Sequence, residues 1–146
     1  MTDELFLNRK DGIGCPMCPD ADDSDVIWHS PVGKIHLKNG ADYRGYCVLI
    51  YHRHAIELYD LHPSERSHFI DVLATVSEQI AAVCQPAKMN TALFGNIVPH
   101  LHCHLIPRYF DDPDWNQAPV FRPDSERRPL SPENYAALLA KLRAKF

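Results

Sequence analysis

The spacing of apolar residues along the chain alternates between a strand-like pattern and a helical one. Five short segments, bounded by turn residues, have the pattern typical of β-strands: 26–29, 34–37, 46–51, 89–94 and 100–106. The clearest is 46–51 (YCVLIY), a run of apolar, β-branched and aromatic residues that favours a buried strand. Pro31 and Gly33 mark a turn between the first two segments, and Gly95-Asn96 joins the last two.

A long segment between the third and fourth of these strands has the helical period. Its apolar residues recur at i, i+3, i+4, i+7, i+11 and i+14, on one stripe: Phe69, Val72, Leu73, Val76, Ile80 and Val83. Pro63 suits the first helical position and Pro86 ends the helix, whereas His62 is a poor N-cap and leaves the start open. Ser131 followed by Pro132 predicts a last helix over about 131–146.

Two segments have neither period. The first 24 residues are interrupted by glycine and proline and are expected to be irregular, and 111–129 forms a proline-rich arm. Trp115 and Phe121 predict that this arm is not disordered but packs on a surface. The element order is three strands, a helix, two strands and a helix. It predicts one α+β domain over 1–146, with a largely antiparallel sheet of about five strands.

The composition excludes several classes of protein. A net charge of -4 disfavours a dedicated nucleic-acid binder, which would usually be basic. No apolar run approaches the roughly 20 residues that span a membrane, and MTDELFLNRKDG lacks the features of a secretory signal. Five cysteines without an export signal predict a cytoplasmic protein with reduced thiols, in which a cysteine pair is more typical of a metal site than of a disulfide.

Three histidines at alternate positions, His100, His102 and His104, occupy the last predicted strand. Side chains alternate between the faces of a strand, so these rings share one face and the apolar residues between them share the other. Imidazoles on such a strand need polar partners. The residues alone leave three interpretations: hydrogen-bonded packing residues, three ligands of one metal ion, or a nucleophile assisted by its neighbours.

Cys15 and Cys18, in CPMC, have the C-x₂-C spacing of a zinc knuckle. Structural zinc takes four nitrogen or sulfur ligands, so a zinc site here requires two further residues. The alternative is a free, reduced cysteine pair in a loop.

The sequence PHLHCHLIPR, from Pro99 to Arg108, resembles the signature of the histidine-triad (HIT) family, in which three histidines alternate with apolar residues. The similarity runs from CPMC through GYCVLIYHRHAIELYDL and the long helix to Pro107-Arg108, roughly two-thirds of the chain. The resemblance implies a HIT-like fold, a homodimer and a nucleotide or dinucleotide substrate. The arm over 111–129 would then pack either on the partner subunit or on the nucleotide pocket. HIT proteins are hydrolases and transferases that cleave the α-phosphate bond of dinucleoside polyphosphates, nucleoside phosphoramidates or adenylates, and they need no organic cofactor.

The resemblance also implies a catalytic role for the triad. His102 matches the family nucleophile, which attacks phosphorus and forms a nucleotidyl-histidine that water or another acceptor resolves. Its other ring nitrogen would donate to the backbone carbonyl of His100. His104 matches the position that contacts the phosphate or the leaving group, and the chemical step needs no metal.

HIT relatives with the CxxC pair often complete a zinc site with two histidines. The resemblance therefore implies a structural zinc site with four ligands: Cys15, Cys18, His54 and His100. His52, close in sequence, is the reserve ligand. Two alternatives are a zinc-dependent hydrolase that uses the triad as ligands, and a nucleotide-binding module with weak catalysis.

Two asparagines match substrate-contacting positions of the family: Asn90 near the phosphates and Asn96 on the leaving-group side. The segment KNGADYRG lacks the acidic residue that usually holds the ribose, for which Asn39 or Asp42 would substitute. Tyr46 stands where many relatives have the histidine of a Gly-His pair. Tyr46 would then supply a hydroxyl to the triad, or simply pack.

Overall fold

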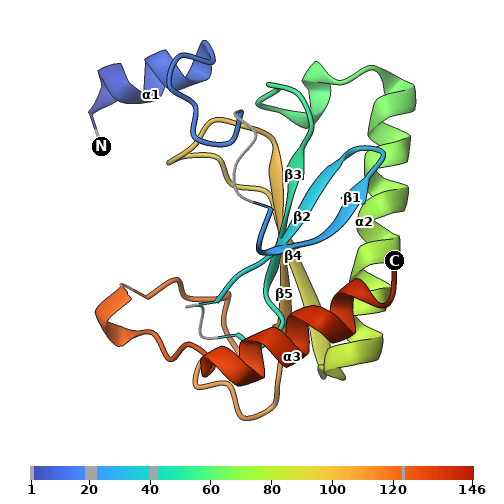
Figure 1. The fold of residues 1–146 in the computed structure, drawn as a ribbon. Coiled ribbons are helices and arrows are strands. Elements are labelled where there is room, and N and C mark those ends of the chain that lie inside the picture. The colour runs from blue at the N-terminus through green and yellow to red at the C-terminus, as the bar shows by residue number, and fades with distance from the viewer. Residues whose placement is uncertain (1, 19–22, 40–42, 123) are drawn as a thin grey trace.

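Five antiparallel strands form one sheet in the order β1-β2-β3-β5-β4 (Figure 1). The structure is a computed structural model, and it describes residues 2–18, 23–39, 43–122 and 124–146. The strands have these bounds: β1 Val26–Ser30, β2 Gly33–Leu37, β3 Cys47–Tyr51, β4 Lys88–Ala92 and β5 His102–Arg108. The predicted α+β class and the five-stranded antiparallel sheet are confirmed.

Strand β5 begins two residues later than predicted, so His100 lies outside it. The ladder with β3 ends at the pair Ile50 and His102. Leu101 is nevertheless held, because its N–H donates to the carbonyl of Ala55 at 2.6 Å and its carbonyl accepts from Tyr51 at 3.0 Å. His100 therefore sits on a pinned loop and does not share a strand face with the other two histidines of the triad.

The long helix α2 (Pro63–Cys84) begins and ends where Pro63 and Pro86 predict. His62 does cap it, because its ring nitrogen Nδ1 accepts from the N–H of Ser64. Glu65 completes a capping box by accepting from the N–H of His62 at 2.8 Å. An imidazole nitrogen can thus replace the usual hydroxyl or carboxylate cap.

The N-terminal segment is not irregular throughout, as the sequence led us to expect: helix α1 spans Asp3–Lys10. Thr2 caps it by accepting from Leu5, and it carries acidic residues in its first turn and basic residues in its last. No residue of α1 is buried. This helix has no apolar stripe, which is why the hydrophobic pattern gave no sign of it.

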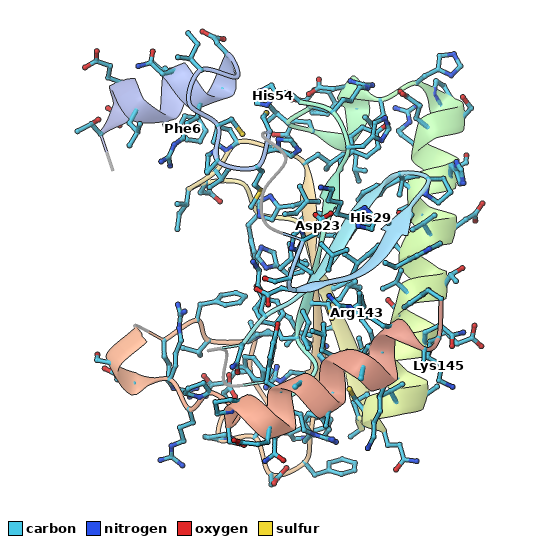
Figure 2. All side chains as sticks on the ribbon, viewed as in Figure 1. Phe6, Asp23, His29, His54, Arg143 and Lys145 are labelled. Carbon is cyan, nitrogen blue, oxygen red and sulfur yellow. The ribbon has the colours of Figure 1, made fainter. Side chains whose placement is uncertain are left out.

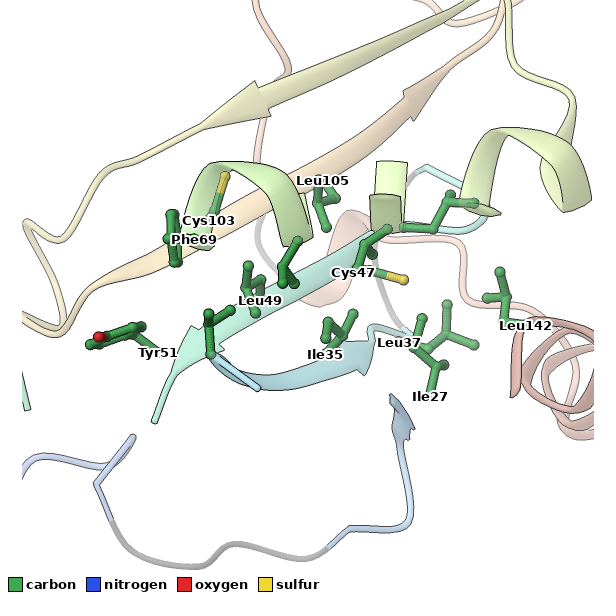
Figure 3. Close-up of a cluster of buried hydrophobic side chains, with 14 of the residues drawn as sticks. Ile27, Ile35, Leu37, Cys47, Leu49, Tyr51, Phe69, Cys103, Leu105 and Leu142 are labelled. Atoms are coloured by element: carbon green, nitrogen blue, oxygen red, sulfur yellow. The ribbon is translucent and has the colours of Figure 1, made fainter. Parts of the chain in front are cut away.

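One face of the sheet carries the core. Helix α2 and helix α3 (Pro132–Arg143) cover it, and Figure 3 shows the buried side chains between them and the strands. The apolar residues of the triad segment point into this core, as predicted: Leu101, Cys103 and Leu105. His102 and His104 therefore lie on the opposite face, which these helices leave uncovered. Two short 3-10 helices complete the structure: η1 Leu58–Asp60 and η2 Asp124–Glu126.

The proline-rich arm folds back on the end of β5 through Arg108, a residue that is only 2% exposed. Its guanidinium donates to the carboxylate of Asp112 at 2.9 Å and to the backbone carbonyls of Asp114 and Gln117 at 2.6 and 3.1 Å. It also donates to the side-chain oxygen of Asn90 on β4 at 3.1 Å. We name these contacts the Arg108 clamp.

The clamp places the next part of the arm on the uncovered face of the sheet. Tyr43 donates its hydroxyl proton to Asp114 and accepts from the N–H of Val120 at 2.9 Å. Phe121 consequently lies against Tyr46, with ring centroids 6.0 Å apart. Of the two aromatic residues from which we expected packing, Phe121 also contacts His104 and Trp115 contacts Phe110. No helix in the described parts of the chain is long and apolar enough to cross a membrane.

Candidate functional site

His102 and His104 stand side by side on β5, with ring centroids 5.0 Å apart. His102 is 7% exposed and His104 is half-buried. Burial lowers the pKa of both imidazoles, that of His104 to about 4, and the nearby positive charge of Lys38 lowers them further. Both rings are therefore neutral at neutral pH.

The hydrogen bond of His102 determines which of its nitrogens is reactive. Its Nδ1 lies 2.5 Å from the backbone carbonyl of His100. A carbonyl can only accept, so Nδ1 carries the proton and Nε2 has a free lone pair. The expected hydrogen bond to residue 100 is thus present.

His104 has a different partner. Its Nδ1 lies 2.6 Å from the hydroxyl of Tyr46, and the two rings stack with centroids 5.9 Å apart. The rings of Phe94, which follows β4, and of Phe121 in the arm lie beside the same imidazole, with centroids 5.2 and 5.4 Å from its own. His104 is thus enclosed on several sides by aromatic rings.

His100 belongs to a separate cluster at the other end of the triad. Four side chains bring their ligand atoms within 4.8 Å of one another: Cys15, Cys18, His54 and His100. Nδ1 of His100 lies 3.5 Å from the sulfur of Cys15 and 3.5 Å from that of Cys18, and Nδ1 of His54 lies 3.1 Å from Cys18. Ligands of one tetrahedral zinc ion lie about 3.3–3.8 Å apart, given its usual bond lengths.

Backbone carbonyls orient both histidines of this cluster. Nε2 of His100 donates to the carbonyl of Tyr51 at 2.8 Å, and Nε2 of His54 donates to that of Lys10 at 2.9 Å. Figure 2 shows His54 beside the loop that follows α1. Each Nδ1 therefore keeps its lone pair and directs it to the thiols, as a metal ligand requires. These four residues can hold a metal ion.

The remaining predicted residues lie in other surroundings. The side-chain oxygen of Asn90 accepts from Arg108, and that of Asn39 accepts from the N–H of Leu130 at 3.1 Å, so the two asparagines bind the residues that flank the arm. Asn96 is exposed in the loop before the triad. Nδ1 of His52 donates to the carbonyl of Val32 at 3.0 Å, and His52 is not among the four clustered ligands. Asp42 lies outside the described residues.

Sequence reasoning missed two features of the site. Lys38 follows β2, and alternation from His36, which pairs with Val48 opposite His104, places it on the same face as the triad. The aromatic surroundings of His104 come from Phe94 and Phe121, which no strand or helix pattern groups together.

A cavity of about 760 Å³ lies farther along the arm, lined by Arg44, Tyr109 and Arg128 among others, and does not include the triad.

The comparisons with known proteins now bear on this arrangement. The family model described as HIT domain matches residues 20–111. The chain belongs to the HIT domain family. No curated protein matches it.

Solved structures of HIT proteins have the same fold. A histidine triad protein from Bradyrhizobium japonicum is 26% identical, with a TM-score of 0.73 over 82% of this chain and 88% of that one. One from Marinobacter aquaeolei is 29% identical, with a TM-score of 0.70 over 82% and 86%. A zinc-bound histidine triad family protein from Mycobacterium smegmatis is 21% identical, with a TM-score of 0.62 over 97% and 93%.

Proposed function

We propose that this HIT protein is a nucleotidyl hydrolase or transferase that acts through His102. The observation that carries the proposal is the hydrogen bond from Nδ1 of His102 to the carbonyl of His100, which leaves Nε2 unprotonated. Burial lowers the pKa of His102, so this nitrogen stays free at neutral pH. HIT membership supports a nucleotide substrate, and we propose that the attack is on its α-phosphorus.

The reaction has two displacements at phosphorus. In the first, the lone pair of Nε2 forms a bond to the α-phosphorus, and the bond to the leaving group breaks with its electron pair going to that group. In the second, water or another acceptor forms the new bond to phosphorus, and the electron pair of the N–P bond returns to Nε2. A neutral His104 contacts the phosphate, and the positive charge of Lys38 favours an anionic substrate on this face.

The cluster of cysteines and histidines serves a different purpose. We assign it to a structural zinc ion, because two thiols and two oriented imidazoles within 4.8 Å suit zinc, and because the Mycobacterium smegmatis relative is zinc-bound. Cys18 must lose a proton to bind, since burial and Cys15 raise the pKa of its thiol to about 11. The ion would fasten the N-terminal segment to the loop before β5.

A zinc hydrolase that uses all three histidines as ligands has less support. Within the described parts of the chain, the cluster of possible metal ligands contains His100 but neither His102 nor His104. Nδ1 of each of these two is already occupied, by a carbonyl and by a phenol. A binding module with weak catalysis remains the second candidate, favoured by the 7% exposure of His102.

Three further properties belong to the same proposal. Residues 1–146 act as one domain, and the protein works in the cytoplasm, where its five cysteines stay reduced. It forms a homodimer, for which β4, at the edge of the sheet, is a ready surface. Nucleotides are its partners, and nucleic acids and membranes are not.

The test is turnover by wild type and by His102→Ala. The panel contains adenosine and guanosine phosphoramidates, dinucleoside tri- and tetraphosphates and adenylylated sulfate. We expect wild type to release a nucleoside monophosphate from at least one of them and His102→Ala to release none, while His68→Ala, an exposed histidine of α2, stays active. Brief chelation should not stop turnover. Immediate loss of activity on chelation would favour the zinc hydrolase, and binding without product would favour the weak module.

A further inference from the structure

Tyr46, the residue immediately before β3, contacts the triad at His104. Its hydroxyl lies 2.6 Å from Nδ1 of His104, and its ring stacks on that imidazole at an interplanar angle of 18°. It also contacts Phe121 of the arm, with ring centroids 6.0 Å apart. Tyr46 is 7% exposed, so this hydrogen bond is largely shielded from water.

The position of Tyr46 is tightly held by the backbone. Its carbonyl accepts from the N–H of Lys38 at 2.9 Å, which continues the ladder between β2 and β3. The preceding residue, Gly45, has φ +85°, and a Cβ there would lie 2.4 Å from the sulfur of Cys84. Only glycine fits this turn without displacing Cys84, so the chain enters β3 at a fixed angle.

The direction of the hydrogen bond follows from counting protons. Burial raises the pKa of Tyr46, so the phenol keeps its single proton, and His104 is neutral with one N–H. If Nδ1 carried that N–H, the phenol would accept, and its own buried proton would need another acceptor. The described structure gives the Tyr46 hydroxyl one hydrogen-bond partner, His104. The phenol therefore donates, Nδ1 accepts, and the proton of His104 is on Nε2.

We propose that Tyr46 is a positioning residue that fixes His104 as the Nε2–H tautomer, so that β5 presents one bare and one protonated Nε2 side by side. His102, fixed by a carbonyl, offers a lone pair. His104, fixed by a phenol, offers a hydrogen-bond donor and keeps its proton. Two adjacent histidines thus acquire opposite properties because one has an acceptor and the other a donor as partner.

The use of this donor rests on the proposed function, whereas the tautomer does not. An attacked phosphate gains negative charge, and an N–H of fixed direction stabilises that charge without reorganisation. A rotating or inverted imidazole would present a lone pair to the anion and repel it. Tyr46 would therefore act on the reaction solely through His104.

The tautomer is measured by two-bond ¹H–¹⁵N correlation of the imidazole nitrogens in ¹⁵N-labelled protein near neutral pH. In wild type we expect His104 to show a protonated Nε2 and His102 a protonated Nδ1. Tyr46→Phe should convert His104 to a mixture of tautomers and leave His102 unchanged. Tyr109→Phe, which removes a hydroxyl that donates to the carbonyl of Arg44, is the matched control and should alter neither ring. Phe121→Leu keeps the phenol and should keep the tautomer.

An Nδ1–H tautomer of His104 in wild type, or the same tautomer in Tyr46→Phe, would overturn the inference. If wild type turns over a substrate, Tyr46→Phe should lower kcat about tenfold with little change in KM, since one hydrogen bond is lost. An equal loss in Tyr109→Phe would also count against it. Absence of turnover in wild type would refute the proposed function, while the nitrogen spectra would still decide the tautomer.

Discussion

The two ends of the triad segment are fastened in opposite ways. At the His100 end, two thiols and two imidazole lone pairs converge, and the carbonyls that fix the imidazoles hold their N–H groups outside the cluster. At the Arg108 end, a buried guanidinium donates to carbonyl and carboxylate oxygens of the arm. The side chains at the His100 end are acceptors that suit a cation, whereas the Arg108 end already contains the positively charged guanidinium.

This difference explains how each end contributes to the site. The Arg108 clamp is complete within the chain, so the arm can carry Phe121 to Tyr46 and His104 without any ligand. The cluster of cysteines and histidines could hold a metal ion. If it binds zinc as we propose, the stability of the N-terminal segment would depend on that ion. His102 lies between the two ends and is fixed by a backbone carbonyl.

Removing the positive charge of Arg108 should have the largest effect on stability. Arg108→Met leaves the buried carboxylates of Asp112 and Asp114, which lie 2.9 and 3.3 Å from the guanidinium, without a positively charged partner. We expect the free energy of unfolding in urea to fall by about 3–5 kcal/mol. Arg53→Met, which breaks an exposed pair with Glu65, is the control and should cost far less. Equal losses would show that the clamp does not hold the arm.

Adding zinc should stabilise the protein through the cluster at the His100 end only. Zinc at a hundredfold excess over its Kd should raise the free energy of unfolding of metal-free protein by about 2.7 kcal/mol. The double variant Cys15→Ser, Cys18→Ser should show no such rise, because it lacks both sulfur ligands. Calorimetry with and without a chelator measures the effect. A zinc response that survives in the double variant would place the metal elsewhere.

A smaller effect should appear at the start of α2, where the half-buried Glu65 supports the His100 end through Tyr51. Glu65 accepts from Arg53, His62 and Tyr51, and these contacts lower the pKa of its carboxyl from 4.5 to about 2. A lowered pKa means that Glu65 adds stability that is fully present above pH 4.5 and is lost as pH falls toward 2.

Glu65→Gln should therefore be less stable than wild type near neutral pH, and the difference should shrink between pH 4.5 and 2. Urea unfolding at several pH values measures it. Glu78→Gln, an exposed glutamate later in α2, is the matched control and should show a flat difference. A difference for Glu65→Gln that grows as the pH falls would contradict the assignment.

The sequence predicted those features of the fold and of the site that follow from the spacing of residue types along the chain. The five strands and α2 appeared in the apolar pattern, and CPMC indicated a cysteine pair of metal-binding type. The ligand set that includes His54 came from the family resemblance, and the structure brings all four residues together. The strand prediction for His100 was wrong, because the N–H of His100 donates to the carbonyl of Val98 at 2.8 Å within the loop and not to a neighbouring strand.

The arm shows what the pattern could not reveal. In the sequence, Arg108 is simply a charged residue after a proline. The residues next to it do not indicate that it is buried among hydrogen-bond acceptors of the arm. Asn90 and Asn39 matched substrate positions, whereas their oxygens hold Arg108 and Leu130. Helix α1 escaped prediction because its stability comes from capping and charge, and not from an apolar stripe.

The most direct test is to identify the residue that carries the nucleotide during turnover. Wild type is mixed with a substrate that it hydrolyses, quenched under alkaline denaturing conditions that preserve a phosphorus–nitrogen bond, digested and analysed by mass spectrometry. We predict one nucleotidyl group on the peptide that contains the triad, bonded to His102, and none in His102→Ala. A nucleotidyl group on another residue, or undiminished turnover by His102→Ala, would contradict the assignment of His102 as nucleophile.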